Sequence, residues 1–125
     1  MNSKKFAKNL IDFIYNSPTA FHAVSTSKEL LDANGFIELD SCKMWDVKVG
    51  GKYYITKNSS AIVAFTVNSD NIEKEGFRII GSHSDSPSFR IKPNAEIEAE
   101  KTYLKLNTEC YGGPILSTWL DRPLG

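Results

Sequence analysis

The chain has 125 residues, of which 41% are hydrophobic, enough to build the core of one domain. Its 15 basic and 15 acidic side chains cancel, which excludes the positive field typical of nucleic-acid binding or of attachment to an anionic membrane. No apolar run reaches the roughly 18 residues of a membrane helix, and "MNSKKFAKNL" lacks the apolar stretch of a signal peptide. We therefore expect a soluble, cytoplasmic protein whose two distant cysteines, Cys42 and Cys110, are free thiols.

The first third of the chain has the pattern of two helices. The dipeptide Ser17-Pro18 has the form of an N-cap followed by proline at the first helical position, and predicts a second helix that stops near Asn34-Gly35. Before it, apolar residues at helical spacing predict an amphipathic helix over residues 4 to 16: Phe6, Leu10, Phe13 and Ile14.

From residue 36 onward the pattern favours strands. "KYYITK" and "AIVAFTV" flank Asn58-Ser59-Ser60, which predicts a hairpin over residues 53–67. The short apolar segment "FRII" predicts a buried central strand over 77–83, with Gly81 allowing a close approach of the backbone. After Pro93 the pattern fits either strands or a short helix. Two helices packed on a sheet predict an α/β layer.

The sequence "GSHSDSP" follows the predicted central strand and contains a histidine and an aspartate two residues apart. If the extended geometry persists, His83 and Asp85 face one crevice, where imidazole can bind zinc and the carboxylate can orient the ring or bind the metal itself. The pattern alone favours a simpler interpretation, a histidine hydrogen-bonded in a loop whose turn Asp85 caps. The second histidine, His22, is expected to have a half-buried structural role on its helix.

Three motifs resemble one family of enzymes. "FIYNSPTAFHAV" (13–24), "GSHSDSPSFRIKP" (81–93) and "YGGPILSTWLDRPLG" (111–125) are similar, in this order, to the aspartyl aminopeptidase and aminopeptidase I family of dinuclear zinc exopeptidases. The resemblance implies that His83 binds one of two zinc ions, other divalent metals being alternatives, and that Asp85 supports this histidine. It also implies an α/β fold with N-terminal helices on the mixed β-sheet of a catalytic domain, followed by the start of an inserted β-rich domain.

The same resemblance implies two domains and an activity. Residues 1–90 would be the N-terminal part of the catalytic domain, and 91–125 the beginning of the inserted domain that mediates subunit contacts in a homo-oligomer. The parent protein would be a metalloaminopeptidase that removes an acidic or neutral N-terminal residue from peptides. The remaining ligands and the glutamate general base would lie beyond Gly125, so the 125-residue piece is expected to be inactive alone. The alternative is a non-catalytic fragment or relative that acts only in folding and subunit assembly.

The last motif also has simpler interpretations. Tyr111-Gly112-Gly113-Pro114 is typical of a turn, and Trp119 and Leu120 are expected to pack in a core or interface. Asp121 and Arg122 fit a surface ion pair.

Overall fold

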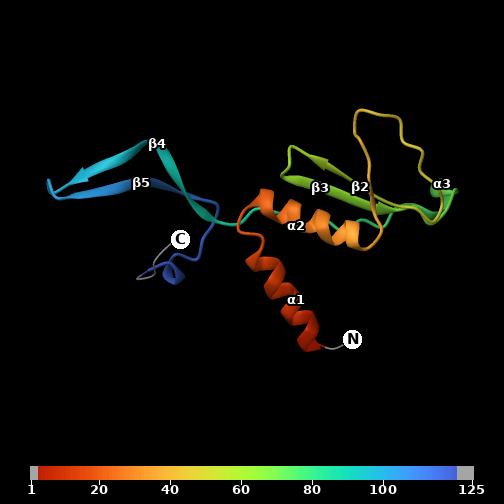
Figure 1. The fold of residues 1–125 in the computed structure, drawn as a ribbon, viewed down its shortest axis with the longest axis horizontal. Coiled ribbons are helices and arrows are strands. Elements are labelled where there is room, and N and C mark those ends of the chain that lie inside the picture. The colour runs from red at the N-terminus through yellow and green to blue at the C-terminus, as the bar shows by residue number, and fades with distance from the viewer. Residues whose placement is uncertain (1–2, 121–125) are drawn as a thin grey trace. The chain divides into compact units, whose positions relative to one another are not determined.

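A computed structural model describes residues 3–120 of the chain (Figure 1). Contacts divide the chain into two compact units, Met1–Asp85 and Ser86–Gly125, which are considered separately below. In the described residues, no helix is both long enough and apolar enough to cross a membrane.

The first unit opens with two helices, α1 (Ser3–Tyr15) and α2 (Ala20–Ala33). Both predicted helices are confirmed, but the cap of the second lies two residues later than expected. Thr19 has extended backbone angles, and its hydroxyl accepts a hydrogen bond from the His22 backbone N–H at 3.3 Å. Ser17 is therefore not the cap, and its buried Oγ has no hydrogen-bond partner in the described structure.

The predicted end of α2 at Asn34-Gly35 is confirmed. Gly35 has a φ of 76°, a conformation that glycine adopts without a steric penalty. The backbone N–H of Gly35 donates to the Asp32 carbonyl, and that of Phe36 to the Leu31 carbonyl, so carbonyls of the last turn are satisfied.

A mixed three-stranded sheet follows the helices, in the order β1-β2-β3. β1 pairs parallel with β2, and β2 pairs antiparallel with β3. The predicted hairpin is thus confirmed, and the residues at its tip, Asn58 and Ser59, take left-handed φ angles of 50° and 54°. The N-terminal helices with this sheet confirm the predicted α/β class. The bounds are β1 Ile37–Glu38, β2 Lys52–Lys57, β3 Ala61–Thr66 and, after the sheet, the short helix α3 Ile72–Glu75.

The core of this unit lies on both faces of β2. Among the described residues, the buried hydrophobic side chains are Val24, Tyr53 and Tyr54. Because successive strand residues point to opposite faces, Tyr54 faces α2, where its hydroxyl donates to Asp32 Oδ1 at 2.8 Å. Tyr53 lies on the other face, with its ring centroid 5.7 Å from that of Phe65. The buried Tyr54 therefore connects helix α2 to the sheet.

The environment of Tyr54 makes one contribution to stability dependent on pH. Burial, and then the hydrogen bond to Asp32, raise the pKa of Tyr54 from 10.0 to about 12. Because the pKa of Tyr54 is higher in the folded than in the unfolded protein, its protonated hydroxyl stabilises the fold below pH 10. This stabilisation is lost as the pH rises through 12. In the complete protein, we expect Tyr54→Phe to lower stability by about 0.5–1.5 kcal/mol at pH 8, with a difference from wild type that shrinks above pH 10.

Denaturant unfolding at several pH values measures this difference. Tyr103→Phe is the matched control, because Tyr103 is 65% exposed and the loss of its hydroxyl should leave stability nearly unchanged. A Tyr54→Phe difference that stays constant between pH 8 and 11 would contradict the assignment.

The prediction of a central strand over residues 77–83 is wrong in this structure. Residues 76–87 form neither helix nor strand, and Ile79 and Ile80 are 85% and 99% exposed. A strand needs a neighbouring strand for its backbone hydrogen bonds, and within residues 3–120 β3 pairs only with β2. A Cβ added at Gly81 would meet nothing within 4 Å, so the expected close approach of the backbone is also absent.

The second unit is a long β-hairpin with a short helical turn. β4 (Ser88–Ala99) pairs antiparallel with β5 (Tyr103–Tyr111). Of the two alternatives left open after Pro93, strands or a short helix, the structure therefore has strands. The register shifts between Ile91 and Glu96, and Pro93 lies inside this irregularity, where a missing N–H is tolerated. The expected domain boundary at residue 90 falls within β4, and the identity of the two domains stays a prediction.

The end of the hairpin is held by aromatic packing. The rings of Phe89 and Trp119 are nearly perpendicular, with centroids 5.0 Å apart, in agreement with a packing role for this tryptophan. The turn over residues 116–118 is the 3-10 helix η1 (Leu116–Thr118). The predicted Asp121–Arg122 ion pair lies outside the described residues.

Candidate metal-binding site

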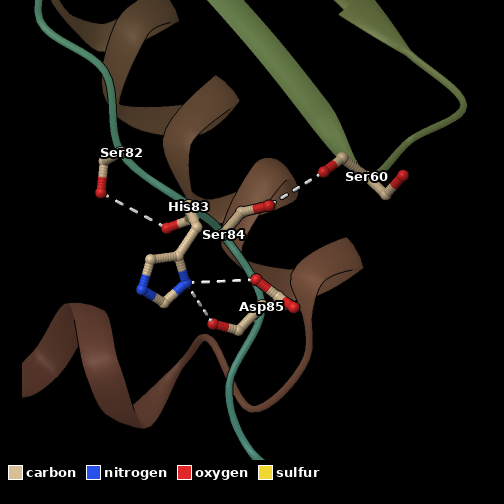
Figure 2. Close-up of polar contacts among 5 residues, drawn as sticks. All are labelled: Ser60, Ser82, His83, Ser84 and Asp85. Atoms are coloured by element: carbon tan, nitrogen blue, oxygen red, sulfur yellow. Dashed lines mark hydrogen bonds and ion pairs between the residues drawn. The ribbon is translucent and has the colours of Figure 1, made fainter. Parts of the chain in front are cut away.

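The structure brings His83 and Asp85 together in the irregular segment that ends the first unit. His83 Nδ1 lies 3.1 Å from Asp85 Oδ1 and 2.9 Å from the Asp85 backbone carbonyl oxygen (Figure 2). This pairing forms without the strand geometry from which it was expected. It arises from the short two-residue spacing within the loop.

The two contacts of Nδ1 determine the state of the imidazole ring. Both partners are oxygen atoms that accept hydrogen bonds, so Nδ1 of His83 must carry the proton. In the neutral ring the lone pair then resides on Nε2. The His83 side chain is 81% exposed, and Figure 2 shows this second nitrogen pointing away from Asp85. The ring is thus prepared to bind a cation through Nε2.

A third residue of the segment points to the opposite side. The Ser84 hydroxyl donates to the Ser60 backbone carbonyl at 2.9 Å, between positions 24 apart in sequence. Figure 2 shows Ser84 directed toward the tip of the β2–β3 hairpin. The sequence did not reveal this partner of Ser84, because no local pattern marks a backbone carbonyl that becomes an acceptor only after folding.

The other candidate ligands do not join this pair. Residues 3–120 contain no cluster of three or more His, Cys, Asp or Glu side chains that could hold a metal ion. His22 is exposed on α2, so the expected half-buried position is wrong, although its Nδ1 lies 2.8 Å from the Thr19 hydroxyl at the start of the same helix. The part of the chain that the structure describes thus supplies one oriented imidazole and one carboxylate.

The comparison with protein families decides the relationship. The family described as "Aminopeptidase I zinc metalloprotease (M18)" matches residues 13–125. The chain belongs to this family. The predicted resemblance is confirmed, and so is membership of a family of zinc-dependent hydrolases.

Relatives of this M18 chain are similar over nearly all of its length. "Probable M18 family aminopeptidase 2" of Clostridium novyi is 61% identical over 123 residues, and the protein with the same name in Clostridium acetobutylicum is 57% identical. Each alignment covers 98% of this chain and 28% of the relative. The chain therefore spans little more than a quarter of the curated relatives it matches.

Solved structures show the same fold. The crystal structure of yeast aminopeptidase 1 matches 97% of this chain and 29% of its own, with a TM-score of 0.82 and 34% identity. The structure titled as the Saccharomyces cerevisiae mApe1 dodecamer matches 98% of this chain and 28% of its own, with a TM-score of 0.81 and 34% identity. The α/β architecture is therefore that of the corresponding part of M18 aminopeptidases.

The residues present fit the zinc ion that the family implies. Zinc-binding histidines usually donate their other ring N–H to a carboxylate or a carbonyl, which fixes the tautomer and raises the basicity of the ligand. His83 makes both contacts with Asp85, one to the side chain and one to the backbone. A single imidazole leaves most of the coordination sphere to other donors.

Proposed function

We propose that this chain is the N-terminal portion of a zinc-dependent aminopeptidase, in which His83 binds one of two zinc ions and Asp85 orients it. One observation carries the proposal: a chain of the M18 family holds its motif histidine with Nδ1 bonded to Asp85 and Nε2 exposed. In the proposed arrangement, residues 1–90 belong to the catalytic domain and residues 91–125 begin an inserted β-rich domain.

The described side chains have a limited set of tasks in this function. Asp85 holds the Nδ1 proton of His83, which keeps the ring in one tautomer and one orientation. His83 then offers the Nε2 lone pair to the metal. When bound, zinc supplies Lewis acidity for the hydrolysis of the peptide bond. The remaining ligands and the general base are proposed to come from sequence that follows Gly125 in the complete enzyme.

We further propose that the complete protein acts on peptide N-termini in the cytoplasm as a homo-oligomer. The net charge of zero agrees with peptide substrates rather than nucleic acids. The mApe1 neighbour is a dodecamer, and large apolar side chains are exposed on both units of this chain. The preferred first residue stays open between an acidic and a neutral side chain.

The alternative, a non-catalytic relative or fragment acting in folding and assembly, is supported by one observation. The described residues contain no complete metal-binding cluster. The non-catalytic alternative and the enzyme hypothesis make different predictions about whether the complete protein binds zinc and cleaves peptides.

Peptides with free and blocked N-termini test the proposed activity. The complete protein, assayed for metal content and with peptides that start with aspartate, glutamate or leucine, should release only the first residue. N-terminal acetylation of the same peptides should abolish cleavage, since an aminopeptidase requires the free amine. Equal cleavage of acetylated peptides would contradict the proposal. A complete protein that binds no zinc and cleaves none of these peptides would also contradict it.

A further inference from the structure

We propose that Ser84 is a positioning residue, which fastens the metal-binding loop to the β2–β3 hairpin and so maintains His83 in the orientation for zinc. This inference rests on the proposed function of His83. It starts from the absence of regular structure over residues 76–87, where no ladder of backbone hydrogen bonds holds the loop. The Ser84 hydroxyl supplies a connection from this loop to the sheet, through a hydrogen bond of 2.9 Å to the Ser60 carbonyl.

The acceptor of this hydrogen bond belongs to a well-defined part of the fold. Ser60 closes the hairpin turn, because its backbone N–H donates to the Lys57 carbonyl at 3.2 Å. The neighbouring pair, Lys57 and Ala61, is the last pair of the β2–β3 ladder. The hairpin therefore determines the position of the Ser60 carbonyl, independently of the irregular loop.

Partial burial strengthens the connection. Ser84 and Ser60 are both half-buried, whereas His83 and Asp85 are exposed. A hydrogen bond shielded from water persists better than one at a fully exposed position, since water competes less for donor and acceptor. The half-buried member of the tripeptide His83-Ser84-Asp85 is thus the one that contacts the hairpin, and the two exposed members form the candidate site.

The position of Ser84 between the two site residues transmits this constraint. Figure 2 shows the Ser84 side chain directed toward Ser60 and away from the imidazole of His83, which Asp85 contacts through its side-chain and backbone oxygens. Fixing the middle residue restricts the backbone angles of its two neighbours. The His83–Asp85 pair is then partly pre-organised before metal binds, so less ordering is required at that step.

The neighbouring Ser82 provides a matched control. Its hydroxyl lies 3.4 Å from the carbonyl of the adjacent His83, a long contact within the loop itself. It does not connect the loop to the hairpin. Removing the Ser82 hydroxyl therefore makes the same chemical change two residues away without removing the proposed attachment.

Zinc affinity of the complete protein, measured by competition with a chelator, tests the inference. We expect Ser84→Ala to weaken zinc binding about 3- to 10-fold, as the loss of one hydrogen bond implies. Ser84→Thr keeps a hydroxyl and should bind zinc within about 2-fold of wild type, and Ser82→Ala should not differ from wild type. The metal-free Ser84→Ala protein should fold and unfold within a few degrees of wild type, since the bond lies outside the buried core.

The outcomes separate this inference from the proposed function. His83→Ala, measured in the same assay, must lose zinc; if it binds zinc as wild type does, the proposed function has failed. If His83→Ala loses zinc while Ser84→Ala binds as wild type, only the role of Ser84 is wrong. Equal losses in Ser84→Ala and Ser82→Ala, or failure of the metal-free Ser84→Ala protein to fold, would also overturn that role.

Discussion

Replacing His83 with alanine in the complete protein should remove one zinc equivalent and nearly all peptidase activity. The imidazole is the group in the described chain that is oriented for a metal, with Nδ1 bonded to Asp85 and Nε2 exposed. Asp85→Ala should have a smaller effect on metal content but still lower activity roughly 10–100-fold, because the ring loses the group that fixes its tautomer. Metal analysis and steady-state kinetics of the purified variants measure both effects.

The second histidine of the chain is the control for this experiment. His22 lies on the exposed side of α2 and contacts the Thr19 hydroxyl, so His22→Ala should leave zinc content and activity unchanged. Thermal unfolding of the metal-free proteins shows whether each variant is folded. Full zinc occupancy in a folded His83→Ala protein would show that His83 is not a ligand.

The 125-residue chain by itself should have no aminopeptidase activity. One imidazole and one nearby carboxylate leave most of a zinc coordination sphere to water, and residues 3–120 contain no larger cluster of ligands. Weak metal binding cannot maintain the activated water that hydrolysis at neutral pH needs. Incubation with zinc, cobalt or manganese and with chromogenic aspartyl, glutamyl and leucyl amides should show no turnover above background.

The isolated chain should also self-associate. Large apolar side chains that a stable monomer would cover are exposed, including Phe77 at 78%, Ile79 at 85% and Ile80 at 99%. Light scattering after size-exclusion chromatography should therefore report species larger than a monomer of 14.0 kDa. Turnover that follows the protein through purification and disappears with His83→Ala would contradict the expected inactivity, and a stable monomer would contradict the expected association.

The sequence by itself determined the local elements of this protein. Helical spacing of apolar residues located α1, and Asn34-Gly35 located the end of α2, because these signals depend on neighbours within one or two turns. The hairpin around residues 58–60 was predictable for the same reason. Three motifs in one order, including the one around His83, together indicated the family that the comparison then confirmed.

Only the tertiary structure decided which long-range contacts these elements make. The segment 77–83 has the composition of a buried strand, yet a strand exists only where a partner strand accepts its hydrogen bonds, and the described residues supply none. The cap of α2 moved from Ser17 to Thr19 because capping depends on backbone angles as well as on residue type. The attachment of Ser84 to the Ser60 carbonyl was not visible in the sequence, since every residue has such a carbonyl and folding alone selects the one that a side chain reaches.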